Sequence, residues 1–423
     1  MTVPFTANAG RHMTIWIVNP YGRLPNEGWR DYRSTMIARA LTAAGHKVVW
    51  WLTNFDHLSK AFRSPMVDGT EFFPGFSVRV LPSTPYSSHI SLARVRSEAN
   101  FGKAFQKEAM DAPRPDIMVV VDPSLFFSKY VLRVRQHHRA KLIVDILDLW
   151  PELFDLALPR PIRWLGKYLF APLYWRRRHL LRQADAIFAV TRDYLAVAES
   201  IPCRIKRVAY LGVDLAQVRH CIQNSDPAAL GAQFCLGAKG DEVWAIYAGS
   251  LGPNYDLDSL LDAAGELKAR SPLLRLVIAG DGSLKTHIQE RIQAEHLSNV
   301  SFLGSLPVDA LTQLYSLCDI ALSTYVQGST VSMPVKAYDY LAAGLPIINS
   351  LGRELGQLVD QNELGINYRP QDARELTEAL ERLAERPDLR QKMRQNALAR
   401  AAVFDSEKQH NAFLQVALEL LHS

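Results

Sequence analysis

Two carboxylates follow a buried apolar run in the first half of the chain. The run KLIVDI is typical of a buried strand, and the residues LDLWPE after it carry Asp148 and Glu152. A carboxylate at the carboxyl end of a strand can orient a hydroxyl group or stabilise positive charge that develops during a reaction. Asp148 and Glu152 are therefore candidate catalytic residues, and Asp148 is also a candidate for binding an acceptor. The alternative for Asp148 is that it only caps a turn, and the same choice stays open for Glu152 and Asp145.

A second candidate site lies in residues 328–350, GSTVSMPVKAYDYLAAGLPIINS. Small polar residues predict a loop here, Pro334 fits the first position of a helix, and Gly344 fits the position where that helix ends with a positive φ. The unpaired amides and the positive dipole end of a helix N-terminus favour an anion such as a diphosphate. The alternative is an ordinary loop–helix unit that binds nothing.

Two charged side chains follow on this predicted helix. Lys336 can neutralise a phosphate, which makes it a candidate for both catalysis and phosphate binding, and its alternative role is that of a solvated helix lysine. Asp339 lies five residues past Pro334 and can reach past the phosphates to a sugar hydroxyl. The residues predicted to bind the ligand in this segment are Ser332, Met333, Pro334, Lys336 and Asp339.

Other loops that leave predicted strands are also rich in small residues. In the second half they carry Gly249, Ser250, Gly280, Asp281, Gly282, Gly304 and Ser305. Four such exits around one sheet, counting the loop before Pro334, indicate a ligand that contains a nucleotide, held by backbone amides. In the first half, the loop after the first strand adds Gly28 and Arg30 as ligand-binding candidates, although it lacks the GxGxxG pattern of a dinucleotide site.

The elements that must position these residues alternate between short apolar runs and helical patterns, which predicts parallel α/β sheets in both halves. Predicted strands cover residues 12–19, 47–52, 77–81, 116–121, 141–146, 186–190, 207–210, 242–247, 274–279, 300–303, 320–323 and 345–348. Predicted helices cover residues 35–44, 90–106, 126–137, 193–200, 257–269, 285–294, 309–317, 337–342, 373–385, 387–404 and 407–421. We expect two Rossmann-like domains that face each other across a cleft.

The predicted domain boundaries follow from this alternation. Residues 1–12 are expected to form a tail, residues 13–214 an N-terminal domain, and residues 242–404 a C-terminal domain. Periodicity is poor over residues 215–241, which predicts a linker. Residues 405–423 are expected to form a separate last helix.

Composition narrows the class of protein. Hydrophobic residues make up 48% and charged residues 22% of the chain, ordinary values for a globular protein. The four cysteines form no CxxC pair, which predicts reduced thiols rather than zinc ligands or disulfides. No signal peptide is visible, and no apolar run reaches the roughly 18 residues that a membrane span needs. We therefore expect a cytoplasmic protein.

Basic charge is concentrated in residues 160–183, RPIRWLGKYLFAPLYWRRRHLLRQ. The interval between Asp155 and Asp185 holds seven Lys and Arg residues and no acid, whereas the whole chain carries a net charge of +5. Cations interleaved with Trp, Tyr and Leu are typical of a helix at a membrane interface, where each cation near an anionic leaflet contributes about 1 kcal/mol. The predicted membrane contacts are Arg160, Arg163, Trp164, Lys167, Trp175, Arg176, Arg177 and Arg178. The alternatives are a buried helix with solvated arginines and, less favoured, a nucleic-acid surface, for which no known module is present.

The segments YAGSLGPNYDLDSLLDAA, LVIAGDG, NVSFLG, LYSLCDIALS and SMPVKAYDYLAAGLPII follow one another in the second half. In this order they resemble the donor-binding domain of GT-B glycosyltransferases of family GT4. In the first half, VDILDLWPE resembles the lipopolysaccharide and O-antigen branch of that family, and NPYGRLPNEGWRDYR, IFAVTRDYLA and VAYLGVD resemble other parts of its N-terminal domain. The resemblance covers residues 13–421 and is most specific at residues 332–348.

The resemblance implies retaining transfer of a sugar from a nucleotide-diphosphate donor, without a metal or another cofactor. It places Asp339 on the ribose of the donor, where the family more often has Glu. The second family glutamate falls at Val331, and the two family cations that neutralise the diphosphate fall near Ser250 and Tyr255, so all three charges are missing here. Lys336, Arg30 and helix-end amides are expected to substitute. The family also predicts that the last helix crosses back to the N-terminal domain.

We therefore expect a glycosyltransferase at the inner face of the cell membrane, with a nucleotide sugar and an anionic membrane surface as partners and no nucleic acid. It would add a sugar to a lipid-linked glycan during polysaccharide or O-antigen assembly, with His89 and Arg96 near the acceptor. Two alternatives stay open. One is a sugar-nucleotide epimerase on the same fold, and the other is a catalytically silent subunit that binds a nucleotide sugar, which the missing acid at Val331 would explain.

Overall fold

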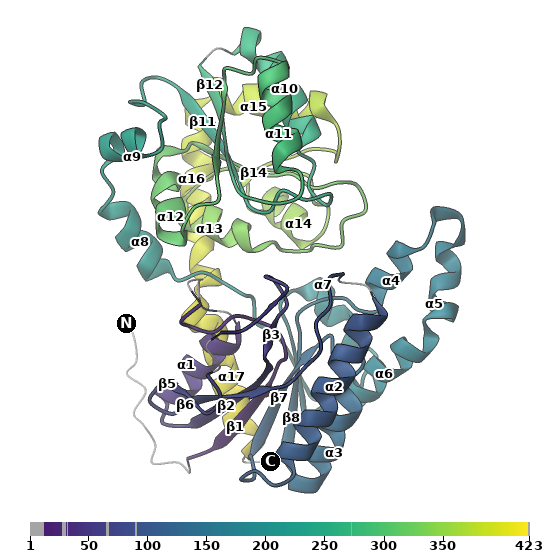
Figure 1. The fold of residues 1–423 in the computed structure, drawn as a ribbon. Coiled ribbons are helices and arrows are strands. Elements are labelled where there is room, and N and C mark those ends of the chain that lie inside the picture. The colour runs from purple at the N-terminus through teal and green to yellow at the C-terminus, as the bar shows by residue number, and fades with distance from the viewer. Residues whose placement is uncertain are drawn as a thin grey trace. The chain divides into compact units, whose positions relative to one another are not determined.

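The computed structural model describes residues 12–27, 31, 33–64, 67–88, 91–271 and 273–421. These residues divide into two compact units (Figure 1). Unit 1 comprises Met1–Tyr210 and Glu407–Ser423, and unit 2 comprises Leu211–Ser406. Each unit is an α/β domain built on its own parallel sheet, which confirms the predicted fold class.

The described part of unit 1 contains an eight-stranded sheet with the order β10-β9-β8-β7-β1-β2-β6-β5. All neighbouring strands are parallel except β5 and β6. The strands are β1 (Thr14–Val18), β2 (Lys47–Thr53), β5 (Glu71–Phe73), β6 (Phe76–Leu81), β7 (Ile117–Asp122), β8 (Lys141–Ile146), β9 (Ala186–Ala189) and β10 (Ile205–Val208), and β3 (Phe55–Asp56) pairs with β4 (Ala61–Phe62) outside this sheet. The central strands β7 and β8 are mostly apolar and buried at every position except Lys141, as is typical of a parallel sheet covered by helices on both faces.

The helices of unit 1 are α1 (Arg33–Ala43), α2 (Leu92–Ala109), α3 (Ser128–His138), α4 (Glu152–Ala157), α5 (Gly166–Leu169), α6 (Ala171–Arg182), α7 (Arg192–Leu195) and α17 (Ser406–Leu421), with the 3-10 helices η1 (Arg160–Leu165) and η2 (Ala196–Ala198). Helices α1, α2, α3, α7 and α17 overlap the predicted helix ranges, whereas α4 was not predicted. The stretch predicted as one basic helix is therefore three short elements, η1, α5 and α6. Gly166 permits the contact of α5 with α4, since a Cβ at this position would lie 2.5 Å from the Asp155 side chain.

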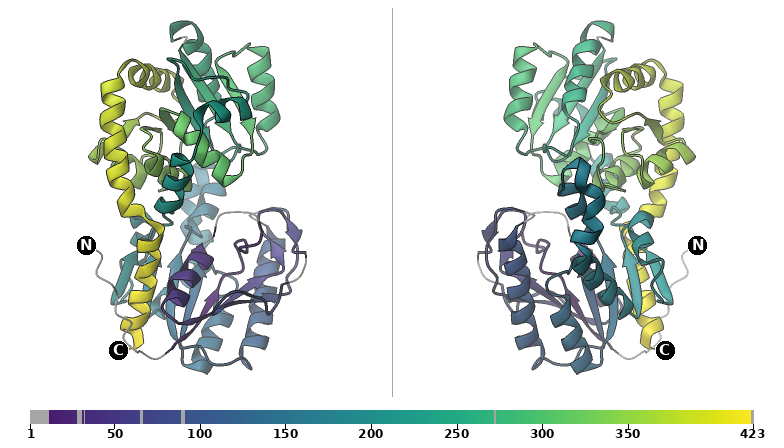
Figure 2. Two further views of the ribbon diagram at one scale, coloured as in Figure 1. Left: turned by 90° about the vertical axis from the view of Figure 1, so that its left-hand side faces the viewer. Right: turned by 90° about the vertical axis from the view of Figure 1, so that its right-hand side faces the viewer.

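Helix α17 joins unit 1 although it ends the sequence. Figure 2 shows it in yellow alongside the teal strands of this unit. Its Phe413 stacks on Phe188 of β9 with ring centroids 3.9 Å apart, and the Arg33 guanidinium lies 5.0 Å from the Phe413 ring centroid. The last helix is thus part of the core of unit 1.

The described part of unit 2 contains a six-stranded sheet with the order β13-β12-β11-β14-β15-β16, all parallel. The strands are β11 (Val243–Ala248), β12 (Leu274–Ala279), β13 (Val300–Gly304), β14 (Ile320–Ser323), β15 (Ile347–Asn349) and β16 (Gly365–Asn367). In chain order this is 3-2-1-4-5-6, the order of a doubly wound nucleotide-binding sheet. The order reverses between β11 and β14, and ligands of such sheets bind beyond the carboxyl ends of the strands at this switch point.

The helices of unit 2 are α8 (Leu215–Gln223), α9 (Pro227–Gln233), α10 (Asp258–Arg270), α11 (Lys285–Ala294), α12 (Val308–Leu317), α13 (Val335–Ala343), α14 (Glu354–Gln361), α15 (Ala373–Glu385) and α16 (Pro387–Ala401), with η3 (Ala402–Phe404). Helix α13 ends at Gly344 with φ +73°, as predicted. Residues 215–241, predicted as a linker, instead contribute α8 and α9 to unit 2. Asp214 and Asp226 cap these helices by accepting the amides of Gln217 and Ala228.

Candidate active site

Three tyrosine rings surround a lysine ammonium at the switch point of unit 2. The Nζ of Lys336, on the first turn of α13, lies 3.9 Å from the ring centroid of Tyr247 in β11. It lies 5.0 Å from that of Tyr255 and 5.3 Å from that of Tyr325, which follows β14. The side chain therefore lies among residues of β11 and of the segment after β14, the two strands between which the strand order places a ligand.

This ammonium group has no hydrogen-bond acceptor. The Lys336 side chain is partly exposed along its length, but Nζ is buried and makes no hydrogen bond within the described chain. Burial lowers the pKa of Lys336 to about 7, and no charged neighbour offsets that effect. The ring faces give modest attraction to a cation, but a buried charge ordinarily needs an anion or oxygen acceptors. The geometry thus prepares a positive charge for an anionic ligand.

The backbone around Lys336 suits the same kind of ligand. Pro334 is the N-cap of α13 and its side chain makes no capping hydrogen bond, while the amide of Ala337 donates to the Pro334 carbonyl at 3.0 Å. Ser332 and Met333 are buried, and the Ser332 carbonyl accepts the amide of Leu355 at 3.0 Å, which fixes the loop. A Cβ at Gly249 would lie 3.4 Å from Lys336 Nζ, so the exit of β11 closely approaches this charge. Pro334 is therefore the residue before the helix and not its first residue, one position from the prediction.

Asp339 lies one turn beyond Lys336 on α13 and is buried, with 6% of its surface exposed. The next residue, Tyr340, ties the helix to the sheet, because its hydroxyl accepts the amide of Ala248 at 3.0 Å and donates to the carbonyl of Leu322 at 3.3 Å. Strands β11 and β14, between which the strand order reverses, are thus both hydrogen-bonded to the helix that carries Lys336 and Asp339.

The glycine-rich exits of β11 and β12 pack against each other instead of presenting free amides. The amides of Gly249 and Gly280 donate to the carbonyls of Ala279 (2.9 Å) and Gly304 (2.7 Å), and that of Gly282 donates to the Asp281 side chain (2.9 Å). A Cβ at Gly280 would lie 1.9 Å from the Gly249 carbonyl oxygen. Glycine is needed here for close approach of two backbones, and these three amides do not support the prediction that they bind phosphate.

The other residues predicted to bind the nucleotide lie in different places. Ser250 and Asp281 are exposed, and Ser305 is exposed beside the edge strand β13, which ends at Gly304. Gly28 and Arg30 of the first half lie outside the described residues, as does His89.

Unit 1 has its own cluster of polar side chains beyond the carboxyl ends of β1 and β8. The Arg94 guanidinium lies 4.0 Å from the Trp150 ring centroid and 5.1 Å from that of Tyr21. Glu98 accepts a hydrogen bond from Arg94 Nε (3.1 Å) and one from the Tyr21 hydroxyl (2.5 Å). The strand order of unit 1 reverses between β1 and β7, so this cluster lies near the corresponding switch point.

Asp148 belongs to this cluster. It accepts the amide of Leu149 at 2.8 Å and the indole N–H of Trp150 at 3.2 Å. Burial raises the pKa of Asp148, and these hydrogen bonds and the charge of Arg94 partly offset that shift. Asp148 is therefore both a turn-forming residue and a carboxylate held near a cation, and its role toward an acceptor stays a prediction.

Glu152 has a fixed partner. Both of its carboxylate oxygens accept hydrogen bonds of 2.6 Å from Arg177, which also donates to the Trp150 carbonyl at 2.8 Å. Arg177 is buried, which corrects its prediction as a membrane contact: it anchors α6 to the segment after β8. Asp122, at the end of β7, is fully buried nearby, and burial raises its pKa to about 6.

Arg96 was predicted to contact the acceptor, whereas Arg94 and Glu98 were not predicted. Arg96 is exposed, whereas Arg94 and Glu98 are buried. The spacing of Arg94, Glu98, Phe101 and Phe105 is four, three and four residues, which places all of them on one buried face of α2. This spacing is the pattern in the sequence that indicates that Arg94 and Glu98 are buried. The same argument separates Arg177, which precedes the buried Leu180 and Leu181, from its neighbours.

The remaining basic segment is largely exposed. Trp164, Tyr168 and Trp175 expose 68%, 76% and 65% of their surfaces, and Leu169 exposes 62%. Arg163, Lys167, Arg176 and Arg178 are exposed among them, and the side chain of Arg160 lies outside the described residues. No helix in the described part of the chain is long and apolar enough to cross a membrane. Nor do the described residues contain a cluster of His, Cys, Asp and Glu that could hold a metal ion.

Family models agree with both units. The model "Glycosyl transferase 4-like domain" matches residues 32–213, and the model "Glycosyl transferases group 1" matches residues 233–400. The chain belongs to the GT4-type glycosyltransferases of the GT-B fold. The predicted family is thereby confirmed.

Relatives of this GT4-type glycosyltransferase are distant. Alpha-D-kanosaminyltransferase of Streptomyces kanamyceticus is 26% identical over 53% of this chain and 57% of its own length. The putative colanic acid biosynthesis glycosyl transferase WcaI of Escherichia coli is 24% identical over 58% of this chain and 60% of its own length. The chain thus matches little more than half of each of these relatives.

Solved structures share the fold over nearly the whole chain. Sucrose-phosphate synthase from Thermosynechococcus elongatus superposes with a TM-score of 0.73 at 18% identity and covers 97% of this chain and 100% of its own. Anabaena Alr3699/HepE in complex with UDP-glucose superposes with a TM-score of 0.66 at 14% identity and covers 97% of this chain and 100% of its own. These similarities establish the GT-B architecture.

Proposed function

We propose that this chain transfers a sugar from a nucleotide-diphosphate sugar to a hydroxyl group of a membrane-associated glycan, with retention at the anomeric carbon and without a metal ion. The new bond joins the acceptor oxygen to the anomeric carbon, and the bond from that carbon to the diphosphate breaks. The leaving diphosphate takes the acceptor proton, so no protein side chain is assigned as an obligatory base. Family membership supports the reaction class.

The buried, unpaired ammonium of Lys336 is the observation that carries the donor side of this proposal. Together with the uncapped start of α13 it offers positive charge where the strand order of unit 2 places a ligand. Negative charge grows on the diphosphate as the sugar departs, and a cation already in position stabilises it most effectively in a site that excludes water. Lys336 therefore takes the role of the cations missing near Ser250 and Tyr255.

The acceptor is assigned to unit 1. Asp148, beside Arg94 and Trp150, would orient the acceptor hydroxyl or stabilise positive charge on the sugar ring. The putative role of the WcaI relative in colanic acid synthesis makes a polysaccharide intermediate the first acceptor to test. The exposed aromatic and basic residues of η1, α5 and α6 would attach the protein to an anionic membrane surface where such an intermediate resides.

Transfer of radiolabelled sugar tests the proposal. Purified protein is incubated with membranes and a panel of nucleotide sugars, and the lipid extract is counted. The expected result is label in the lipid fraction from one donor, and NMR of the product should show the anomeric configuration of the donor. Inversion at the anomeric carbon would contradict retention.

The same assay separates the alternatives. A catalytically silent subunit would bind a nucleotide sugar and transfer none of it. An epimerase would change the sugar of the nucleotide without any acceptor. The exposed basic segment favours transfer over epimerisation, because a soluble nucleotide sugar needs no membrane surface.

A further inference from the structure

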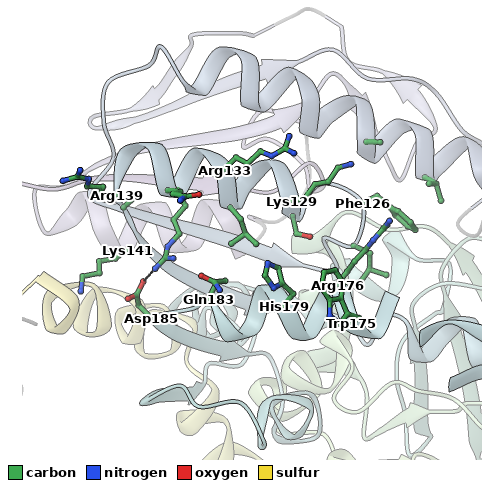
Figure 3. A pocket seen from close by; sticks show the side chains of 18 residues that line it. Phe126, Lys129, Arg133, Arg139, Lys141, Trp175, Arg176, His179, Gln183 and Asp185 are labelled. Carbon is green, nitrogen blue, oxygen red and sulfur yellow. Dashed lines mark hydrogen bonds and ion pairs between the residues drawn. The ribbon is translucent and has the colours of Figure 1, made fainter. Parts of the chain in front are cut away.

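A groove of about 1230 Å³ lies in unit 1 between helices α3 and α6 (Figure 3). Lys129 and Arg133 lie on its α3 side, and Trp175, Arg176 and His179 lie on its α6 side. The groove is separate from the Asp148 cluster, and no step of the proposed reaction uses it.

The charge of the groove is strongly positive. Its single acid, Asp185, is paired with Arg135 at 3.0 Å. Five other cations line it without a carboxylate partner among the described residues, and they are Lys129, Arg133, Arg139, Lys141 and Arg176. A surface with this excess of unpaired cations complements an anionic ligand.

Apolar groups line the same groove. Leu125 is buried, and Val95 and Leu132 are partly buried. At one end, the Arg176 guanidinium lies 5.6 Å from the Phe126 ring centroid, and Trp175 stacks on His179 with ring centroids 5.3 Å apart. The ligand that fits a cationic rim over an apolar floor is an amphiphile with an anionic head.

The groove is continuous with the exposed basic segment, because α6 belongs to both. Trp175 lines the groove and is 65% exposed, and Trp164 and Tyr168 of the same segment are exposed as well. An anionic phospholipid in a membrane contacted by these rings would find the cations of the groove next to them. A nucleic-acid backbone offers no aliphatic chain that would pack on this apolar floor.

We propose that the α3–α6 groove binds a single anionic phospholipid, with its phosphate at Lys129, Arg133 and Arg176 and the start of an acyl chain on the apolar floor. This inference rests on the membrane attachment proposed above. It adds a defined lipid site to what would otherwise be attraction between a basic surface and a charged bilayer.

A short-chain lipid tests the site without a membrane. Dihexanoyl phosphatidylglycerol is titrated, below the concentration at which it forms micelles, into the full-length protein and followed by calorimetry. The double variant Lys129→Glu, Arg133→Glu should bind it at least about tenfold more weakly. The variant Lys103→Glu, Lys107→Glu changes the charge equally on the exposed side of the neighbouring helix α2, and it should bind as wild type does.

Several results would overturn the proposal. They are equal binding by the groove variant, equal binding of zwitterionic dihexanoyl phosphatidylcholine, glycerol phosphate binding as tightly as the lipid, or an oligonucleotide displacing it. Sedimentation with phosphatidylglycerol vesicles distinguishes the lipid site in the groove from membrane attachment of the basic segment. Protein that sediments with vesicles but ignores the short-chain lipid disproves the groove site and leaves membrane attachment intact.

Discussion

Lys336 combines two properties that conflict in an empty protein: it is a cation, and its Nζ is buried without an acceptor. Such a group lowers the stability of the fold unless a ligand compensates for it. Buried polar groups without a hydrogen-bond partner are rare in folded proteins, and a functional role is a common explanation for them. The residue that costs stability is thus the one assigned to the donor diphosphate.

Replacing Lys336 by Met should raise the stability of the protein at acidic pH. The pKa of Lys336 is about 7 in the folded protein and about 10.5 in the unfolded chain. Between these two pH values the unfolded chain holds a proton on this lysine and the folded protein does not. The stability of the wild type therefore increases as pH rises through this window. Lys336→Met lacks this dependence. By urea unfolding we expect it to be more stable than wild type by about 1–2 kcal/mol near pH 6, with the difference shrinking by about pH 9. A less stable variant at pH 6 would show that the charge already has a partner.

Asp148→Asn should reduce turnover and leave donor affinity unchanged. A correctly placed group that stabilises charge in the transition state contributes about 100-fold or more to the rate. Burial raises the pKa of Asp148, so wild-type turnover should fall on the acidic side at a higher pH than it would with an aspartate of ordinary pKa. The variant should not show this fall in turnover. Steady-state kinetics across pH measure both effects, with the exposed Asp111→Asn as control. Full activity of Asp148→Asn would reduce Asp148 to a turn-forming residue.

At the scale of the helix, the face on which an arginine lies determines whether it is buried and paired or exposed to solvent. Arg177 is buried and paired, whereas its neighbours Arg176 and Arg178 are exposed. The sequence of α6 carries Arg on nearly all sides, so composition alone could not separate these three. The apolar spacing to Leu180 and Leu181 distinguishes Arg177, and the same kind of spacing distinguishes Arg94 from Arg96.

Membrane attachment should depend on the exposed rings of the basic segment. Trp164→Ala combined with Tyr168→Ala removes two side chains that are 68% and 76% exposed, so the fold should persist while sedimentation with anionic vesicles falls about tenfold or more. Leu273→Ala with Leu398→Ala trims apolar residues exposed on unit 2 and should leave sedimentation unchanged. Undiminished sedimentation of the aromatic variant would disprove the role of this segment.

Glycine-rich loops show a limit of reading sites from the sequence. The exits of β11 and β12 have the small residues of a phosphate loop, but their amides bond across to neighbouring strands. A sequence reveals that backbone must approach something closely there, and it does not reveal whether that is a ligand or another loop. For α13 the sequence was more informative, since the proline before it and the glycine after it each restrict the local backbone conformation.

At the scale of the whole molecule, both sheets were predictable because long apolar strands alternate with amphipathic helices. Four of the five strands with two or three residues, β3, β4, β5 and β16, were missed because they are too short to show a period, whereas β15 was predicted from the apolar run before it. Helices α8, α9 and α14 were also missed; each has nine residues or fewer, about two turns, over which a helical period is hard to recognise. The assignment of α17 to unit 1 needed the family resemblance, since local sequence carries no information on which sheet a helix joins.

Phe413→Ala should destabilise unit 1 selectively. Phe413 is buried on α17 against Phe188, and truncating a buried Phe costs about 3–5 kcal/mol. Hydrogen exchange resolved by peptide should accelerate across unit 1 and stay unchanged across unit 2, with the exposed Gln415→Ala as control. Equal acceleration in both units would show that they unfold as one.

The central claim is that Lys336 and the start of α13 hold the donor diphosphate, and calorimetric titration with a panel of nucleoside diphosphates tests it most directly. Wild type is compared with Lys336→Met and with Lys285→Met, which removes a partly exposed lysine from the start of α11 in the same unit. The account predicts that Lys336→Met weakens binding of the preferred diphosphate about tenfold or more, while Lys285→Met binds as wild type does. Equal affinity of Lys336→Met and wild type would contradict it.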